Sequence, residues 1–268
     1  KTIYARIETA DGCVLVRALW LVVKDTPNAP TTEDYAICAD DLLAALPDGE
    51  GLTADCNVGG GDGGPIKVLV LAAVITPSLT TDVQAKLASD ARFSVVDAYD
   101  LNSMAAPSLA LLQDYDAVLA FTGAPDFYDF GTVLKDYADG GGAVVTALPS
   151  NVSGNSLVGT WPGSVYPLVA TGNYSSFDGP KTLGTVYNAG HPIMQGVSTF
   201  NGGSFSGRNN TNTLLGGATR IADWSDGLPL VVVNSGLGPN SVRRADLNFY
   251  PPSSDASASY WDASTDGA

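Results

Sequence analysis

Residues 66–74, with the sequence IKVLVLAAV, form an unbroken apolar run that leads into a helix-forming segment. The same order, a short apolar run and then a helix-forming segment, recurs as far as Leu148. Strands that alternate with helices in this way form a parallel sheet with helices on both faces. The sequence therefore predicts an α/β domain. The expected further elements are helices at 80–88, 107–113 and 130–138 and strands at 93–96, 117–121 and 143–148.

The rest of this domain is less regular. Residues 150–217 are rich in Gly, Ser, Asn and Thr, which favours long loops with short strands. Two more strands are expected at 228–233 and 245–250, and the polar segment that follows shows no closing helix. We therefore assign 66–268 to one α/β domain.

Residues 1–57 are predicted to form a separate, small β module. Apolar segments at 2–8 and 13–23 flank a turn at Asp11-Gly12, which is typical of a β-hairpin. The Gly-rich residues 58–65 precede a strand and not a helix, which favours a linker over a phosphate-binding loop. Because an isolated hairpin is only marginally stable in water, we expect it to pack on the α/β domain, on a neighbouring subunit or on upstream sequence.

The composition is that of an acidic globular protein. The chain has 268 residues, is 45% hydrophobic and carries a net charge of −15, so we expect no binding to nucleic acid or anionic membranes. No apolar run reaches the length of a membrane span. Scarce Lys with abundant Asp, Asn, Ser, Thr and Gly is typical of an extracellular or cell-surface protein. Since the chain opens on Lys1, we expect a processed product or a fragment of a longer protein.

Cysteines, sequons and acidic residues indicate few definite sites. Cys13, Cys38 and Cys56 fit no zinc pattern, and a disulfide between two of them is expected in an exported protein, with the pairing left open. N-x-[ST] sequons make Asn151, Asn173 and Asn209 glycosylation candidates. The aspartates suit calcium, but no calcium-binding loop motif is present, so we assign no metal site and no cofactor.

Both parts of the chain resemble known families. In the α/β part, the informative segments are KVLVLAAV from Lys67, YDAVLAF from Tyr115, VLKDYADGGGAVV from Val133, GHPIMQGV from Gly190 and LNFYPPSSDA from Leu247. Through these segments it resembles the amidotransferase-like, flavodoxin-like superfamily, in its ThuA-like branch and related domains of secreted bacterial proteins. The N-terminal part, through TIYARIETADGC and LWLVVKDTP, resembles the tail of an immunoglobulin-like repeat of bacterial surface proteins.

The resemblance to amidotransferases implies a nucleophilic Cys at a sharp turn after a strand. The corresponding strand ends here read Phe121-Thr122-Gly123 and Leu148-Pro149-Ser150, and neither has Cys. Because the thiolate performs that chemistry, the amidotransferase mechanism is disfavoured, and we lean towards a protein that is not an enzyme.

Ligand-site candidates lie near the predicted strand ends. Thr76, Thr122 and Asp126 would line the crevice at the carboxyl edge of the sheet if the first and third strands are neighbours, and Asp97 and Asp100 lie near the same edge. His191, the single histidine, is a further candidate. We expect its imidazole to bond to the backbone of a turn, with a catalytic or metal-binding role as the alternative.

Aromatic and basic residues allow more than one interpretation. Six aromatic residues are expected to pin long loops onto the sheet, although aromatic rings also stack on sugars or fill interfaces. The pair Arg243-Arg244 is expected at a solvated strand edge, with a contact to a neighbour's acidic patch as the alternative. The six aromatic residues are Trp161, Tyr166, Tyr174, Phe177, Phe200 and Phe205.

The hypothesis that fits these features best is a non-catalytic extracellular structural protein. It would assemble into fibres through contacts of its N-terminal strands, whose open edges pair readily with another chain. The alternative is a ThuA-like domain that binds or processes carbohydrate, with glycans as partners. A third hypothesis is a calcium-stabilised adhesion module.

Overall fold

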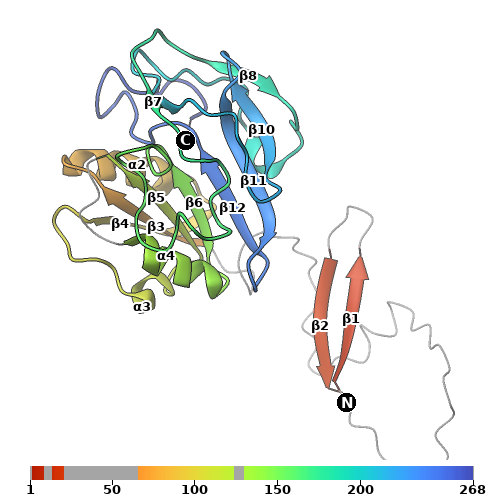
Figure 1. Cartoon of the computed structure of the whole chain (residues 1–268). Helices are drawn as coiled ribbons and strands as arrows, with labels where there is room; N and C mark the ends of the chain where they lie inside the picture. The colour runs from red at the N-terminus through yellow and green to blue at the C-terminus, as the bar shows by residue number, and fades with distance from the viewer. Residues whose placement is uncertain (1, 9–13, 21–65, 124–129, 268) are drawn as a thin grey trace, which may run out of the picture. The chain divides into compact units, whose positions relative to one another are not determined.

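The computed structural model describes residues 2–8, 14–20, 66–123 and 130–267 (Figure 1). The chain divides into two compact units, Lys1–Val58 and Gly59–Ala268. In the first unit, β1 (Thr2–Glu8) and β2 (Val14–Trp20) form a two-stranded antiparallel sheet, which confirms the predicted hairpin. The second unit contains the α/β domain.

The α/β domain is built on an eight-stranded sheet in the order β4-β3-β5-β6-β12-β11-β10-β8. The first five strands of that order are parallel, and the remaining three pair in antiparallel fashion. The parallel strands are β3 (Ile66–Ala73), β4 (Phe93–Asp100), β5 (Ala117–Thr122), β6 (Ala143–Ala147) and β12 (Val242–Leu247). The antiparallel strands are β8 (Leu183–Val186), β10 (Thr219–Trp224) and β11 (Pro229–Leu237).

The order of the five parallel strands is the flavodoxin-like order 2-1-3-4-5, so the predicted fold class is confirmed. The sequence predicted a fully parallel sheet. The structure corrects this prediction, because antiparallel strands extend the sheet beyond β12. The sequence predicted β11 but not β8 or β10, because the Gly- and Asn-rich segment that precedes β10 shows no periodic signal. A separate small sheet pairs β7 (Tyr174–Ser175) with β9 (Arg208–Asn209).

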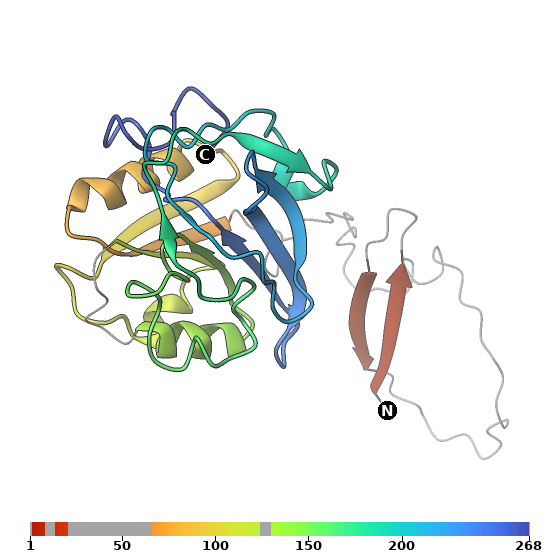
Figure 2. The same ribbon diagram turned by 45° about the horizontal axis from the view of Figure 1, so that its top comes forward.

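Helices cover both faces of the parallel strands, as Figures 1 and 2 show. The helix α2 (Pro77–Ala88) lies on one side, and α3 (Leu109–Leu112) and α4 (Phe130–Asp139) lie on the other. The strand β3 is buried on both faces, because Leu69 and Leu71 pack in one core and Val70 and Ala72 in the other. This double burial explains the unbroken apolar run at the start of the domain.

The antiparallel strands have a core of their own. It is formed by residues such as Phe200, Ile221, Trp224 and Trp261. After β12, the C-terminal segment (residues 251–267) contains neither a helix nor a strand. It is tied to the domain by hydrogen bonds, for example from the backbone nitrogen of Asp262 to Asn201 O at 2.8 Å. Within the described residues, no helix is long and apolar enough to cross a lipid bilayer.

Candidate functional site

The sequence predicted a ligand-binding crevice at the carboxyl edge of the sheet. The strand β3 lies between β4 and β5, so the strand order reverses between β3 and β5, where ligands bind in folds of this kind. Thr122 ends β5 there and is fully buried. Its hydroxyl donates a hydrogen bond to Asn155 O at 2.6 Å, so this candidate group is already occupied by the backbone of the following loop.

Tyr250 occupies the space next to Thr122. Its hydroxyl lies 2.7 Å from the point where a Cβ on Gly123 would be, so only glycine leaves room for it. Its ring meets Phe121 edge-on with 5.9 Å between ring centroids. Burial raises the pKa of Tyr250, and the neighbouring hydroxyls of Tyr260 and Tyr174 raise it further, so the phenol stays neutral. The position at which related folds bind ligands is thus filled by the chain's own side chain.

The other candidates at this edge do not form a cluster with Thr122. Thr76 is exposed as the N-cap residue of α2, and its side chain makes no capping hydrogen bond. Asp97 accepts a hydrogen bond from the Tyr115 hydroxyl at 2.8 Å, and Asp100 accepts one from the backbone nitrogen of Asn102 at 2.9 Å. Asp126 lies outside the described residues, as do Cys13, Cys38 and Cys56.

His191 is a structural residue in this geometry. It precedes the 3-10 helix η2 (Pro192–Met194), and its Nδ1 accepts a hydrogen bond from the backbone nitrogen of Ile193 at 3.2 Å. In the described part of the chain, its imidazole bonds to no side chain. The described residues also contain no group of three acidic, His or Cys side chains that could hold a metal ion.

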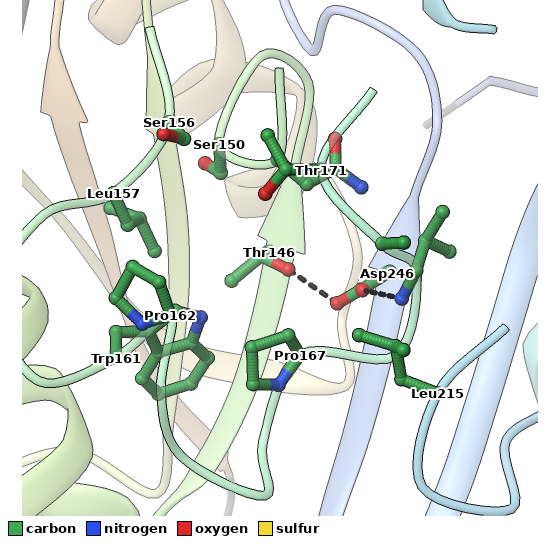
Figure 3. Close-up of a pocket in the computed structure, with 13 residues that line it drawn as sticks. Thr146, Ser150, Ser156, Leu157, Trp161, Pro162, Pro167, Thr171, Leu215 and Asp246 are labelled. Atoms are coloured by element: carbon green, nitrogen blue, oxygen red, sulfur yellow. Dashed lines mark hydrogen bonds between the residues drawn. The ribbon is translucent and has the colours of Figure 1, made fainter. Parts of the chain in front are cut away.

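A cavity of about 170 Å³ opens at the carboxyl ends of β6 and β12 (Figure 3). One wall is apolar and is formed by Leu157, Trp161, Pro162, Pro167 and Leu215. The facing wall carries hydroxyl and amide groups from the loops after β6. These polar residues are Ser150, Asn151, Ser156 and Thr171.

Thr146 and Asp246 lie at the inner end of this cavity, where Figure 3 shows them joined by a hydrogen bond. The carboxylate of Asp246 also accepts hydrogen bonds from the backbone nitrogens of Leu168 at 2.9 Å and Val169 at 3.1 Å. Its remaining partner is Arg244, whose Nη2 lies 2.7 Å from Oδ1. All acceptor positions of the carboxylate are therefore occupied by the protein.

The structure corrects the predicted position of Arg244. We expected it at a solvated strand edge, but it is 2% exposed and its guanidinium lies 4.8 Å from the centre of the Trp161 ring. Burial lowers the pKa of Arg244, and the facing Asp246 carboxylate opposes that change. Arg243 is exposed, as expected. The alternation in VRRADL, which places Arg244 and Asp246 on one face of β12, was the signal that could have revealed the pair.

The aromatic residues separate into two groups. Trp161, Tyr166 and Phe200 are buried and hold loops against the sheet, as expected. Tyr174 and Phe177 are 38% and 67% exposed, so they do not serve that purpose alone. Both rings contact Phe205, with centroid separations of 5.9 Å and 5.1 Å.

The three sequons differ in accessibility. Asn173 is exposed and Asn151 is half-buried at the cavity wall. Asn209 is fully buried, and its side-chain nitrogen donates to Asn151 O at 2.9 Å and to Ala170 O at 3.0 Å. A glycan on Asn209 would break these hydrogen bonds, so the fold disfavours that position.

Comparison with known proteins finds similarity in structure and not in sequence. No family model and no curated protein sequence matches the chain. A ThuA-like protein from Bacteroides uniformis has a similar structure, with a TM-score of 0.48 and 14% sequence identity, over 71% of this chain and 84% of that chain. The name of the Bacteroides uniformis protein is that of the ThuA-like branch, which the sequence of this chain resembles. At this identity the likeness concerns the fold alone, and the fold class rests on the strand order given above.

Proposed function

We propose that this chain is a non-catalytic extracellular structural protein that associates with copies of itself through its N-terminal β module. The observation that carries the first half of the proposal is the position of Tyr250. Its neutral phenol fills the crevice beside Gly123, and the hydroxyl of Thr122 is bonded to the backbone. His191 likewise bonds to the backbone. These groups form contacts that stabilise the fold, so none of them is positioned to act as a nucleophile or a base.

The β1–β2 sheet supports the second half. It has two strands, and neither outer edge pairs with another described strand. The register places Ile3 opposite Leu19 and Ile7 opposite Leu15. A two-stranded sheet is marginal by itself, and open edges are a template for another chain. Pairing with a neighbouring copy would supply both the missing strands and the missing core.

Deletion of residues 1–30 tests this proposal. The truncated chain keeps the whole described α/β domain, so it should fold and remain a monomer. The full chain should form larger particles, seen by light scattering after size exclusion and as filaments in electron micrographs. In a second variant, Val16→Pro in the full chain, the lost backbone donor should weaken pairing of β2 without shortening the protein. Particles of the same size from all three proteins would refute the proposal.

A second candidate function, carbohydrate binding, is favoured by the cavity at the carboxyl ends of β6 and β12. Asp246 is the one charged residue among its lining residues, and Arg244 compensates that charge. Asn151, Ser156 and Thr171 form no side-chain hydrogen bond with another described residue, so they are free to bind a ligand. A cavity of about 150 Å³ is large enough for benzene, so this one has room for part of a hexose, which has about twice as many non-hydrogen atoms as benzene. Neutral charge, an apolar wall and free hydroxyls together suit such a ligand.

Titration with neutral hexoses, followed by amide NMR shifts, tests this candidate. Ser156→Ala and Thr171→Val should each weaken binding several-fold, because each removes about one hydrogen bond. Thr185→Val, an exposed threonine on β8, is the matched control. Absence of any shift at millimolar sugar, or equal effects of the control, would exclude the cavity as a sugar site.

A further inference from the structure

The side chain of Phe177 is exposed on a backbone conformation that is unusual for it. It is 67% exposed, and its ring meets Phe205 edge-on with 5.1 Å between ring centroids. Single exposed apolar residues are common, but Phe177 also has φ = 57°. Among the described residues, the other non-glycine residues with positive φ are Ser206 and Ser241, neither of which is bulky. Such a conformation persists where the surrounding structure enforces it, often at functional positions.

Polar contacts hold the loop that carries this ring. The backbone nitrogen of Phe177 donates to Phe205 O at 2.9 Å. The next residue, Asp178, pairs at 2.6 Å with Arg208, which is 3% exposed. The backbone beneath the exposed ring is therefore fixed before any partner binds, which lowers the entropy lost on binding.

The cavity at the carboxyl ends of β6 and β12 matches a phenyl ring in size and chemistry. Its volume is about 170 Å³, and a cavity of about 150 Å³ holds benzene. A phenyl ring thus fits whole, whereas a hexose fits only in part. Trp161 lies in the apolar wall, and aromatic pairs attract one another beyond the area they bury. Leu215 lines the cavity and is 37% exposed, so the apolar wall continues to the surface.

The exposed ring and the cavity belong to opposite faces of the sheet. Phe205, which Phe177 contacts, packs against the same core as Val83 of α2. Trp161 of the cavity packs in the other core, with Leu134 of α4. The two helices cover opposite faces of the parallel strands (Figures 1 and 2). One copy can therefore offer its ring to one neighbour and its cavity to another.

We propose that the phenyl ring of Phe177 in one copy inserts into the cavity of the next copy. This inference rests on the self-association proposed above, to which it adds a contact between α/β domains. Because the ring and the cavity are different surfaces, the contact is head-to-tail, and it builds an open filament unless the rotation closes a circle of copies.

The contact is too small to act alone. An aromatic side chain buries about 150–250 Å², whereas a stable interface buries about 1,200 Å² or more. The ring therefore strengthens and orients the association of full chains, and the chain without residues 1–30 stays monomeric.

Phe177→Gly tests the exposed ring, because glycine adopts the positive φ without strain. Association of the full chain should weaken at least about tenfold, as for an aromatic residue at the centre of an interface, and the melting temperature should stay close to that of the parent. Ile75→Ala is the matched control, since Ile75 is 68% exposed, and it should leave association unchanged. Unchanged association of Phe177→Gly overturns the inference.

Leu215→Asp tests the cavity. An inserted ring would strip water from the new carboxylate, so association should weaken about as much as in Phe177→Gly. Met104→Asp adds the same charge at another exposed apolar position, 44% exposed, and should have no effect. Equal losses in the two aspartate variants would show that charge alone is responsible, which contradicts the inference.

The double variant shows whether Phe177 and the cavity meet each other. Phe177→Gly and Leu215→Asp each remove the same contact, so the chain that carries both should associate no more weakly than either single variant. Two independent surfaces would instead give losses that multiply. Multiplied losses would overturn the inference, even if each single variant weakens association.

A soluble phenyl compound identifies the occupant. Benzyl alcohol at millimolar concentration should compete for the cavity and lower the association of the parent towards that of Phe177→Gly. The association of Phe177→Gly itself should not change, which controls for general solvent effects. If glucose competes and benzyl alcohol does not, the cavity is a sugar site and the inference fails.

Comparison with the deletion of residues 1–30 separates this inference from the proposal beneath it. If the deletion abolishes association and Phe177→Gly leaves it unchanged, the β module mediates self-association and the inference fails. If Phe177→Gly weakens association and the deletion does not, the α/β domains associate without the β module and the earlier proposal fails. If neither change affects particle size, both fail.

Discussion

At the scale of single residues, the buried Arg244–Asp246 pair organises the centre of the sheet. Arg244 Nη1 donates to Val144 O, and its Nε donates to Tyr166 O at 3.1 Å. The pair therefore connects β12, β6 and the loop that carries Trp161. A buried ion pair is weak evidence for net stability, but removal of one partner leaves a charge that nothing compensates.

Asp246→Asn should lower the free energy of unfolding by about 3–5 kcal/mol, because the Arg244 guanidinium would remain buried without a counter-ion. In either orientation, the amide nitrogen would also face present donors, the backbone nitrogens of Leu168 and Val169 or the side chains of Thr146 and Arg244. Urea unfolding followed by tryptophan fluorescence measures the change. Asp136→Asn, at an exposed helix position, is the control and should change the free energy of unfolding by less than about 0.5 kcal/mol. Equal unfolding midpoints for the two variants would show that the pair does not contribute in this way.

At the scale of elements, the C-terminal segment takes the place of a closing helix. The carboxylate of Asp82 in α2 accepts hydrogen bonds from the backbone nitrogen of Ser253 at 2.6 Å and from its hydroxyl at 3.1 Å. Near the end of the segment, Asp266 accepts hydrogen bonds from the backbone nitrogens of Ser198 at 2.9 Å and Thr199 at 2.8 Å. Hydrogen bonds to carboxylates, together with the buried ring of Trp261, thus attach this segment where other domains of this class have an apolar helix face.

Acid should loosen this attachment. The backbone donors of Ser198 and Thr199 lower the pKa of Asp266 from 3.8 to about 2, so the folded state favours the carboxylate. The stabilisation is present above the ordinary pKa and is lost as the pH falls from about 4 to 2. Asp266→Asn should lower the melting temperature at pH 6 and show a smaller further loss between pH 4 and 2 than the parent. Parallel melting curves of variant and parent across this range would contradict this role.

Some elements could be predicted from the sequence because their signal is local. The strands β3, β5 and β6 are apolar on both faces, and α4 is strongly amphipathic, so their positions follow from periodicity alone. The helix α2 begins earlier than expected, because Pro77 suits its first turn. The short strands β8 and β10 have no such periodicity, and their positions are determined by pairing with neighbouring strands of the sheet.

The cavity and the exposed positions of Tyr174 and Phe177 could not be predicted for a different reason. The cavity combines β6, β12 and several loops, so no single segment carries its pattern. The neighbouring positions of β3 and β5 follow from the predicted fold class, but no periodic signal shows that Tyr250, more than a hundred residues later, lies beside Gly123 at the end of β5. Likewise, the positive φ of Phe177 is a property of the folded loop and has no counterpart in the composition.

At the scale of the whole chain, the position of β12 governs how the α/β domain can form. This strand comes late in the sequence, yet it lies in the middle of the sheet, parallel to β6 and antiparallel to β11. During synthesis, the ribosome must therefore release the chain beyond Leu247 before the two halves of the sheet can join. Until then β6 and β11 each have an unpaired edge. A chaperone that shields those edges would have its greatest effect on this last step of folding.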